Sequence, residues 1–226
     1  MATAGRGTAV KVLVVDVGGT SIKVAATGHR ARVRIPSGPS MTPARMVRLV
    51  REATSGWDYE AVAIGYPGPV HDGKPAREPR NLGRGWTRFA FDRAFERPVR
   101  MINDAAMQAL GSYKRGRMLF LGLGTGLGSA LIVDGAVAPL ELAHLPYRKG
   151  RTYEEYVGKG GLKRLGKSRW RRHVAKVARQ LGAALDADEI VIGGGNARLL
   201  HALPAGSRLG SNQNAFAGGY RLWSRP

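Results

Sequence analysis

The sequence contains no cysteine, few acidic side chains and no long apolar run. The missing cysteines exclude disulfides and thiolate metal sites, which is compatible with a reducing cytoplasm. No apolar run approaches the roughly 20 residues that a membrane-spanning helix needs, and the N-terminal residues lack the apolar stretch of a signal peptide. We therefore expect a cytoplasmic protein without a membrane partner.

Acidic residues are scarce relative to basic ones. The chain of 226 residues has 36 Lys and Arg against 16 Asp and Glu, a net charge of +20. A field this positive favours a polyanionic partner such as polyphosphate, nucleic acid or an anionic surface. The alternative is a generally basic surface without a dedicated ligand. The length suffices for one large domain or two small ones.

Strand and helix patterns alternate along the chain. Apolar, β-branched runs predict strands within 11–35 and at 61–66, 99–102, 118–123, 130–133 and 189–192. Helical periodicity predicts helices at 41–54, from 104 to about 113, at 152–185 and at 213–223. Residues 71–90 are rich in Gly, Pro and Arg and predict a long functional loop. The alternation predicts an α/β fold.

Four predicted strands end in polar or glycine-rich turns, at residues 16–20, 103–104, 124–128 and 193–196. Ligands of α/β sheets bind beyond the carboxyl ends of strands, so we expect these turns to converge on one phosphate-bearing ligand. Glycine turns let backbone amides approach a phosphate, and Asp16 could hold Mg²⁺ or its water beside it. The alternatives are an ordinary turn at Asp16 and a plain hairpin turn at 124–128.

Six motifs follow one another in the chain. They are Asp16-x-Gly18-Gly19-Thr20-x-x-Lys23, Pro67-Gly68-Pro69-Val70 with Asn81 and Trp86, Asn103-Asp104-Ala105, Gly124-Thr125-Gly126-x-Gly128, Glu141-Leu142-Ala143-His144 and Gly193-Gly194-Gly195. Together they resemble the ROK family of sugar kinases, and most of all its polyphosphate glucokinase branch, within the actin/hexokinase-like superfamily. The resemblance runs from about residue 12 to residue 223.

This resemblance implies an α/β, actin/hexokinase-like (ribonuclease H-like) fold with two domains, 1–110 and 111–226, and a cleft between them. Whether the last helix packs back on the first domain is left open. The implied activity is Mg²⁺-dependent phosphoryl transfer from polyphosphate or ATP to a hexose, in the first place the 6-hydroxyl of glucose. The alternatives are a strictly ATP-dependent sugar kinase and a non-catalytic sugar- or polyanion-binding relative, against which the retained Asp104 argues. A homodimer is left open.

The resemblance also implies roles for individual residues. Asp104 is the expected general base, because a carboxylate can take the proton of a sugar hydroxyl as the P–O bond forms; the alternative is a helix N-cap. The expected sugar-side residues are Asn81, Asn103, Asp104, Glu141, His144 and Glu154. The expected phosphate-side residues are Asp16 (with Mg²⁺ through water), Gly18, Gly19, Thr20, Lys23, Gly124, Thr125, Gly126, Gly128, Gly194 and Gly195. For Lys23 the alternative is a solvated strand position.

Two departures from the family pattern stand out. Ala143 replaces the usual glycine before His144, for which a purely structural role is the alternative. Many members also carry a zinc-binding cysteine cluster after this motif. Because the chain has no cysteine, we expect no structural zinc, and polyphosphate glucokinases lack that cluster too.

A basic run covers residues 159–172. We expect Lys159, Lys163, Arg164 and Lys167 to form a track for polyphosphate; the alternatives are a solvated helix face and, less favoured, nucleic-acid binding. Residues 161–168 also fit the P-loop pattern G-x-x-x-x-G-K-[ST]. A P-loop must leave a buried strand, and the charged residues 153–160 are not one, so we interpret the segment as a basic helical surface.

Overall fold

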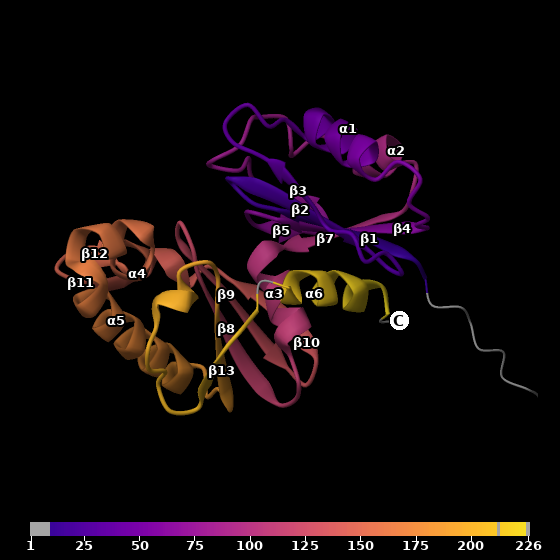
Figure 1. The fold of residues 1–226 in the computed structure, drawn as a ribbon. Coiled ribbons are helices and arrows are strands. Elements are labelled where there is room, and N and C mark those ends of the chain that lie inside the picture. Colours follow the sequence, from indigo (N-terminus) through magenta and orange to yellow (C-terminus); the bar gives the residue numbers. More distant parts are fainter. Residues whose placement is uncertain (1–9, 212, 225–226) are drawn as a thin grey trace, which may run out of the picture. The chain divides into compact units, whose positions relative to one another are not determined.

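The computed structural model describes residues 10–211 and 213–224, which form two compact units (Figure 1). The first unit comprises the described residues up to Met101 and those from Gly219 onwards, and the second runs from Ile102 to Gly218. The boundary therefore follows Met101, whereas the sequence analysis set it after residue 110. The last helix is divided between the two units.

The first unit is built on a five-stranded sheet in the order β3-β2-β1-β4-β7. Its strands are β1 (Val12–Val17), β2 (Ser21–Ala26), β3 (Val33–Pro36), β4 (Ala61–Tyr66) and β7 (Val99–Asn103). β1 pairs antiparallel with β2 and parallel with β4. The sheet is thus a hairpin-connected meander of β1 to β3 extended by β4 and β7, and the runs at 11–35, 61–66 and 99–102 predict strands at these places.

Helices α1 (Pro43–Ala53) and α2 (Phe91–Phe95) lie on one side of this sheet (Figure 1). Thr42 begins α1 by accepting the Arg45 amide hydrogen at 3.3 Å, and Pro43 occupies the first turn, where no amide donor is needed. Alternate β1 residues, among them Leu13 and Val15, join the apolar core beneath these helices. The short hairpin of β5 (Val70–His71) and β6 (Lys74–Pro75) opens the predicted long loop.

The second unit repeats the strand pattern of the first. Its sheet has the order β10-β9-β8-β13-β14. The strands are β8 (Arg117–Leu123), β9 (Leu127–Val133), β10 (Ala136–Leu140), β13 (Glu189–Gly193) and β14 (Ser207–Leu209). Here β8 pairs antiparallel with β9 and parallel with β13, as β1 does with β2 and β4. Both units therefore place a central strand between a hairpin and a parallel crossover.

Both faces of the second sheet are covered. Met118 and Phe120 pack in one core with helix α3 (Asp104–Ser112), and Leu119 and Leu121 pack in another with helix α5 (Lys159–Ala184). This two-residue alternation follows from the pleat of the strand. It also explains why residues 118–121 of β8 are all apolar, as expected for a strand buried on both faces.

The last helix, α6 (Asn214–Trp223), packs closely through glycines. A side chain on Gly111 of α3 or on Gly218 of α6 would collide with the backbone of the other helix. In the first unit, Gly219 lies against Val14, and the Trp223 indole nitrogen donates to the Val62 carbonyl at 3.1 Å. The two halves of α6 therefore belong to different units.

The predicted helix at 152–185 is two helices, α4 (Tyr153–Val157) and α5, which meet at Gly158. Residues 161–168 lie inside α5, which is kinked at Gly166 (φ 74°), so the helical interpretation is confirmed and the P-loop pattern is coincidental. The 3₁₀ turns η1 (Leu142–His144) and η2 (Ala197–Leu199) and the small hairpin β11 (Pro146–Arg148) and β12 (Arg151–Thr152) complete the second unit. In the part of the chain described, every helix is too short or too polar to cross a membrane.

Candidate functional site

The first group of candidate residues lies in the first unit, at the turn after β1. Asp16 is only 4% exposed, and the Lys23 ammonium lies 2.9 Å from its Oδ2. The β1–β2 register places these two residues directly opposite each other. Lys23 is therefore the counter-ion of a buried carboxylate. The sequence analysis considered a phosphate contact or a solvated strand position for Lys23, but not this ion pair.

The glycine turn brings the candidate sugar residue Asn81 next to the candidate phosphate residues. The Gly18 amide donates to the Ser21 carbonyl at 3.1 Å, and a Cβ on Gly18 would lie 2.8 Å from that oxygen. A Cβ on Gly19 would lie 3.1 Å from the Asn81 Cβ. The exposed Thr20 completes the turn. Asn81 is thus seated on the turn, and the absence of side chains at the two glycines makes this approach feasible.

The loop that carries Asn81 is closed by a carboxylate clasp. Glu78 accepts hydrogen bonds from the amides of Gly85, Trp86 and Thr87 at 3.0–3.2 Å and from the Thr87 hydroxyl at 2.9 Å. Partial burial raises the pKa of the Glu78 carboxyl, but these hydrogen bonds together outweigh it, so its pKa is lowered overall. The clasp therefore fixes both ends of the segment 78–87 while the carboxylate is ionised.

We expect Glu78→Gln to lower the melting temperature at pH 7 by about 2–4 °C, corresponding to about 1 kcal/mol for a largely exposed charge-assisted cluster. Because the folded-state pKa lies below the ordinary 4.5, the stabilisation is present above pH 4.5 and is lost as the pH falls through the folded-state value. The difference in melting temperature between wild type and Glu78→Gln should therefore become smaller below pH 4.5 in a pH series of thermal melts. Glu52→Gln, which breaks an exposed ion pair with Arg48, is the matched control and should change little. A difference in melting temperature that does not depend on pH would contradict the stabilising role of the ionised Glu78 carboxylate.

Trp86, which the resemblance places in the sugar-side loop, is a core residue. It is fully buried, with its ring centroid 5.6 Å from that of Tyr66 and 6.1 Å from that of Phe91. Its indole nitrogen is buried without a hydrogen-bond partner among the described residues. The tryptophan therefore anchors the loop in the core of the first unit.

In the second unit, Asn103 and Asp104 begin helix α3. The Asn103 side-chain oxygen accepts the amide hydrogens of Ala105 and Ala106 at 3.0 and 3.1 Å, so Asn103 is the N-cap. Asp104 occupies the first helical position, and its Oδ1 accepts from the Ala105 amide at 2.7 Å. The capping role that was the alternative for Asp104 thus belongs to its neighbour. The sugar-side role expected of Asn103 stays a prediction.

Residues 124–128 do form a hairpin turn, between β8 and β9, and its tip is tightly packed. A Cβ on Gly126 would collide with the Glu154 carboxylate, and one on Gly128 would lie 2.8 Å from the Ala105 Cβ. The turn therefore lies between α4, which carries Glu154, and the start of α3, which carries Asp104. The exposed Thr125 stands at the tip.

The glycine loop after β13 lies against this hairpin. Asn196 donates from its side chain to the Gly124 carbonyl and from its backbone to the Leu123 carbonyl, both at 3.0 Å. The Lys159 amide, at the start of α5, donates to Gly124 as well, at 3.1 Å. The strand-end turns at 124–128 and 193–196 thus converge as predicted. A pocket of about 370 Å³ opens beside them, lined by Gly194, Gly195, Asn196, Ala197, Arg198, Leu209 and Gly210.

Glu141 precedes the 3₁₀ turn η1 and His144 is the last residue of that turn, and both side chains are exposed. The hydroxyl of the buried Ser129 donates to the carbonyl of Leu140, the residue before Glu141, at 2.8 Å. Ala143, the departure from the family pattern, is buried in the core. Since η1 packs against α4 and β9, Glu141 and His144 lie on a turn that contacts the helix carrying Glu154 and the strand that follows the hairpin.

The segment after His144, where the resemblance would place the cysteine cluster that this chain lacks, is held by an aromatic cluster of Tyr147, Tyr153, Tyr156 and His173. The Tyr147 ring stacks on that of Tyr153 at 5.1 Å between centroids and meets that of Tyr156 edge-on at 5.0 Å. The Tyr147 hydroxyl lies 3.0 Å from His173 Nδ1. Burial, followed by nearby cations of which Arg148 is the strongest, lowers the pKa of the His173 imidazole. The cluster joins the β11–β12 hairpin and α4 to α5.

The basic run is exposed, but its members differ. Lys159, Lys163 and Lys167 are exposed on α5 and form no ion pair in the part of the chain described. Arg164 instead donates to the Glu155 carbonyl at 2.6 Å and lies over the Tyr156 ring at 5.0 Å. Arg164 therefore has a structural role that its sequence neighbours lack.

The described residues contain no cluster of three or more His, Asp or Glu side chains arranged to hold a metal ion. The expectation of no structural zinc stays a prediction. Mg²⁺ poses a different requirement, because it is bound by one or two carboxylates together with waters and substrate phosphates. The buried Asp16 carboxylate, with one oxygen engaged by Lys23, fits this donor set.

Sequence reasoning missed the Glu78 clasp, the aromatic cluster and the pairing of Asp16 with Lys23. The two glycine turns 16–20 and 124–128 lie in different units, and each has its own neighbours. Asn81 joins the first turn, and Asp104, Glu154 and η1 join the second.

Comparison with known proteins agrees with these motifs. The polyphosphate glucokinase of Mycobacterium tuberculosis (strain CDC 1551 / Oshkosh) is 27% identical over 206 residues, covering 81% of this chain and 77% of that protein. The glucokinase of Pyrobaculum calidifontis is 29% identical over 133 residues, which cover 56% of this chain and 40% of that protein, so the chain spans less than half of that relative.

Among solved structures, the inorganic polyphosphate/ATP-glucomannokinase from Arthrobacter sp. strain KM has the same fold, with a TM-score of 0.79 and 23% identity over 95% of this chain and 98% of that one. The fold is therefore of the actin/hexokinase-like class, as expected. The profile of the ROK family matches residues 12–139. From this match and from the motifs at their places in the fold, the chain belongs to the ROK family.

Proposed function

We propose that this protein transfers a phosphoryl group from polyphosphate or ATP to a hexose hydroxyl, in the first place the 6-hydroxyl of glucose. The observation that carries the proposal is the position of Asp104 at the start of α3. Its neighbour Ala105 packs against Gly128 of the glycine hairpin. A candidate base and a candidate phosphate loop thus share one place in the second unit. The relatives named for glucokinase and polyphosphate glucokinase activity support the same reaction.

Asp104 acts as the general base in this proposal. Its carboxylate takes the proton of the sugar hydroxyl while the hydroxyl oxygen bonds to the terminal phosphorus. The bond from that phosphorus to the rest of the donor breaks, which leaves ADP or a chain one phosphate shorter. Asn103, Asn81, Glu141, His144 and Glu154 orient the hexose, since amides, carboxylates and imidazole together match hydroxyls that both donate and accept.

The glycine turns hold the donor. In the turns at 18–20, 124–128 and 194–195 the amides of Gly18 and Gly124 are used inside the turn, and the remaining amides are the proposed donors to phosphate oxygens. Asp16 is the residue that would hold Mg²⁺ through water, and the ion would neutralise charge on the phosphates. Lys23, whose ammonium lies 2.9 Å from Asp16 Oδ2, orients the Asp16 carboxylate for that role.

The donor is proposed to be polyphosphate because α5 carries three exposed positive charges, Lys159, Lys163 and Lys167, and begins at the hairpin, where the Lys159 amide contacts Gly124. ATP as sole donor is the second candidate, favoured by the 370 Å³ pocket at Gly194 and Gly195, whose size suits a small ligand. A polyanion bound through many screened contacts depends on salt more than ATP does.

Replacing Lys159, Lys163 and Lys167 together by Ser is expected to raise the apparent KM for polyphosphate about tenfold at low salt and to leave the KM for ATP nearly unchanged. Arg164 is kept because it packs on Tyr156. In wild type, raising the salt from about 50 to 200 mM shortens the Debye length from roughly 14 to 7 Å and should raise the polyphosphate KM far more than the ATP KM.

The matched control replaces three exposed lysines elsewhere, Lys74, Lys149 and Lys176, by Ser, which removes the same net charge. If both triple variants lose polyphosphate use equally, the overall charge and not this helix face attracts the donor. If wild type makes no product with polyphosphate at low salt, the ATP-dependent candidate takes first place.

A further inference from the structure

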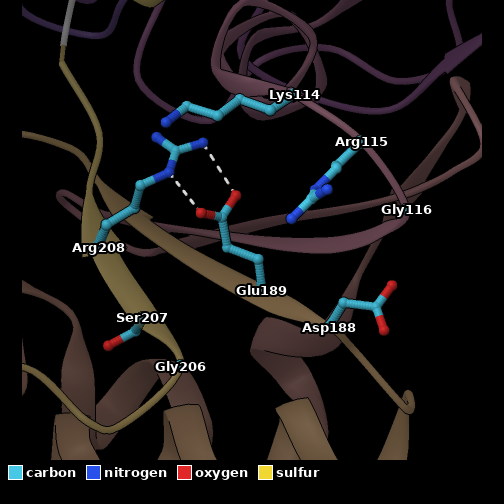
Figure 2. Close-up of a pocket in the computed structure, with 8 residues that line it drawn as sticks. All are labelled: Lys114, Arg115, Gly116, Asp188, Glu189, Gly206, Ser207 and Arg208. Carbon is cyan, nitrogen blue, oxygen red and sulfur yellow. Dashed lines mark hydrogen bonds and ion pairs between the residues drawn. The ribbon is translucent and has the colours of Figure 1, made fainter.

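A second pocket, of about 710 Å³, is drawn in Figure 2, and it lies at the end of the second sheet where β8, β13 and β14 begin, opposite to the glycine loops. It is lined by Lys114, Arg115, Gly116, Asp188, Glu189, Gly206, Ser207 and Arg208. These residues stand at the beginnings of β8, β13 and β14, whereas residues 124–128 and 193–196 follow the ends of β8 and β13. The pocket is therefore separate from the candidate active site, and its volume is within the range of small-molecule sites.

Three cations gather around one carboxylate in this pocket. Figure 2 shows the ammonium of Lys114 beside the guanidinium of Arg208 and the guanidinium of Arg115 on the other side of Glu189. Arg208 binds both oxygens of Glu189, at 2.6 and 3.0 Å, and also donates to the Ser112 carbonyl. Lys114 and Arg115 form no hydrogen bond or ion pair with any residue that the structure describes.

The second carboxylate of the pocket does not balance these charges. Asp188 accepts the Arg117 amide hydrogen at 2.7 Å, and Figure 2 shows its side chain pointing away from the three cations. One carboxylate, already bound bidentately by Arg208, thus faces three positive groups. Like charges held together in this way repel one another, and a bound anion removes that repulsion.

We propose that this pocket binds a phosphate group of a small phosphorylated molecule. A phosphate presents several oxygens, so it can accept from the planar guanidinium of Arg115 and from the ammonium of Lys114 at once. Polyphosphate and nucleic acid need an extended basic surface, whereas these cations converge within one concave site. The proposal does not depend on the phosphotransfer reaction.

Inorganic phosphate is the probe for this site. Its binding to the full chain is measured at low ionic strength by isothermal titration calorimetry, for wild type and for the double variant Lys114→Ser with Arg115→Ser. We expect the double variant to bind phosphate at least about tenfold more weakly, because two charge-assisted contacts are lost. The matched control, Lys176→Ser with Arg179→Ser, removes the same charge from the exposed face of α5 and should change the affinity by less than about twofold.

Both double variants keep every residue placed at the candidate active site, so phosphate bound there contributes equally to each. A conservative exchange, Lys114→Arg with Arg115→Lys, keeps both charges and should retain binding within about threefold. Turnover with glucose should be the same in wild type and in the Lys114/Arg115 serine variant, which separates this site from the proposed reaction. Equal loss in both serine variants, or unchanged affinity in the Lys114/Arg115 serine variant, would overturn the proposal.

Discussion

Replacing Asp104 by Asn is expected to lower kcat about 10²–10⁴-fold, the usual contribution of a general base. The amide has the shape of the carboxylate but cannot take the proton of a sugar hydroxyl. Its oxygen can still accept the Ala105 amide hydrogen, and Asn103 still caps α3, so the helix should form as in wild type. The loss should therefore fall on kcat, with hexose affinity changed by less than about threefold.

The free energy of unfolding of Asp104→Asn distinguishes a catalytic role of Asp104 from a purely structural one. Removing one negative charge from the first turn of a helix costs about 0.3–1 kcal/mol, too little to unfold the protein. Asp134→Asn, in an exposed turn with φ 46° that asparagine tolerates, is the matched control and should retain full turnover. If Asp104→Asn retained more than about a tenth of the wild-type kcat, Asp104 would not be the base.

The second large effect is expected for Gly194→Ala. Gly194 has φ +84°, and a Cβ there would lie 2.5 Å from the Leu123 carbonyl oxygen and 2.6 Å from the Leu123 amide nitrogen. The left-handed backbone costs a side chain about 1–2 kcal/mol, and forcing the backbones apart adds about 1–3 kcal/mol. We expect a loss of about 2–5 kcal/mol in the free energy of unfolding, because rigid strand backbone has to move.

The neighbouring glycine provides the control. A Cβ on Gly195 would meet nothing within 4 Å, and its φ is not in the left-handed region. Gly195→Ala should therefore change the free energy of unfolding by less than about 1 kcal/mol. Urea unfolding of the two variants side by side measures the difference. Equal stabilities would mean that the contact between residues 193–196 and the end of β8 does not hold the loop.

Elements with a strong local signal could be predicted from the sequence. The apolar runs of β1, β4, β8 and β13 are buried on both faces, and the Thr42-Pro43 start of α1 is a local capping pattern. The sequence predicts the strands β8 and β13 together with their glycine-rich ends. Because turns at the carboxyl ends of neighbouring parallel strands lie at the same end of a sheet, the convergence of residues 124–128 and 193–196 could be predicted as well.

Elements without such a signal were not predictable. β10 is mostly exposed and contains Pro139, which argues against a strand interior, and β14 has only three residues, so neither gives the signal of a buried strand. The Glu78 clasp depends on how a loop folds back over seven to nine residues, and the pairing of Asp16 with Lys23 depends on the register set by the turn between them. The aromatic cluster joins Tyr147 to His173, 26 residues apart, through tertiary packing alone.

The most direct test of the central claim is a coupled assay for hexose phosphate. The full chain is incubated with glucose, Mg²⁺ and either polyphosphate or ATP at low salt, and glucose 6-phosphate is detected through its oxidation by a specific dehydrogenase. We predict product with polyphosphate, at a rate that Asp104→Asn lowers about 10²–10⁴-fold. Product with ATP alone would overturn the polyphosphate donor, and no product with either donor, from folded protein and a panel of hexoses, would contradict phosphoryl transfer to a sugar.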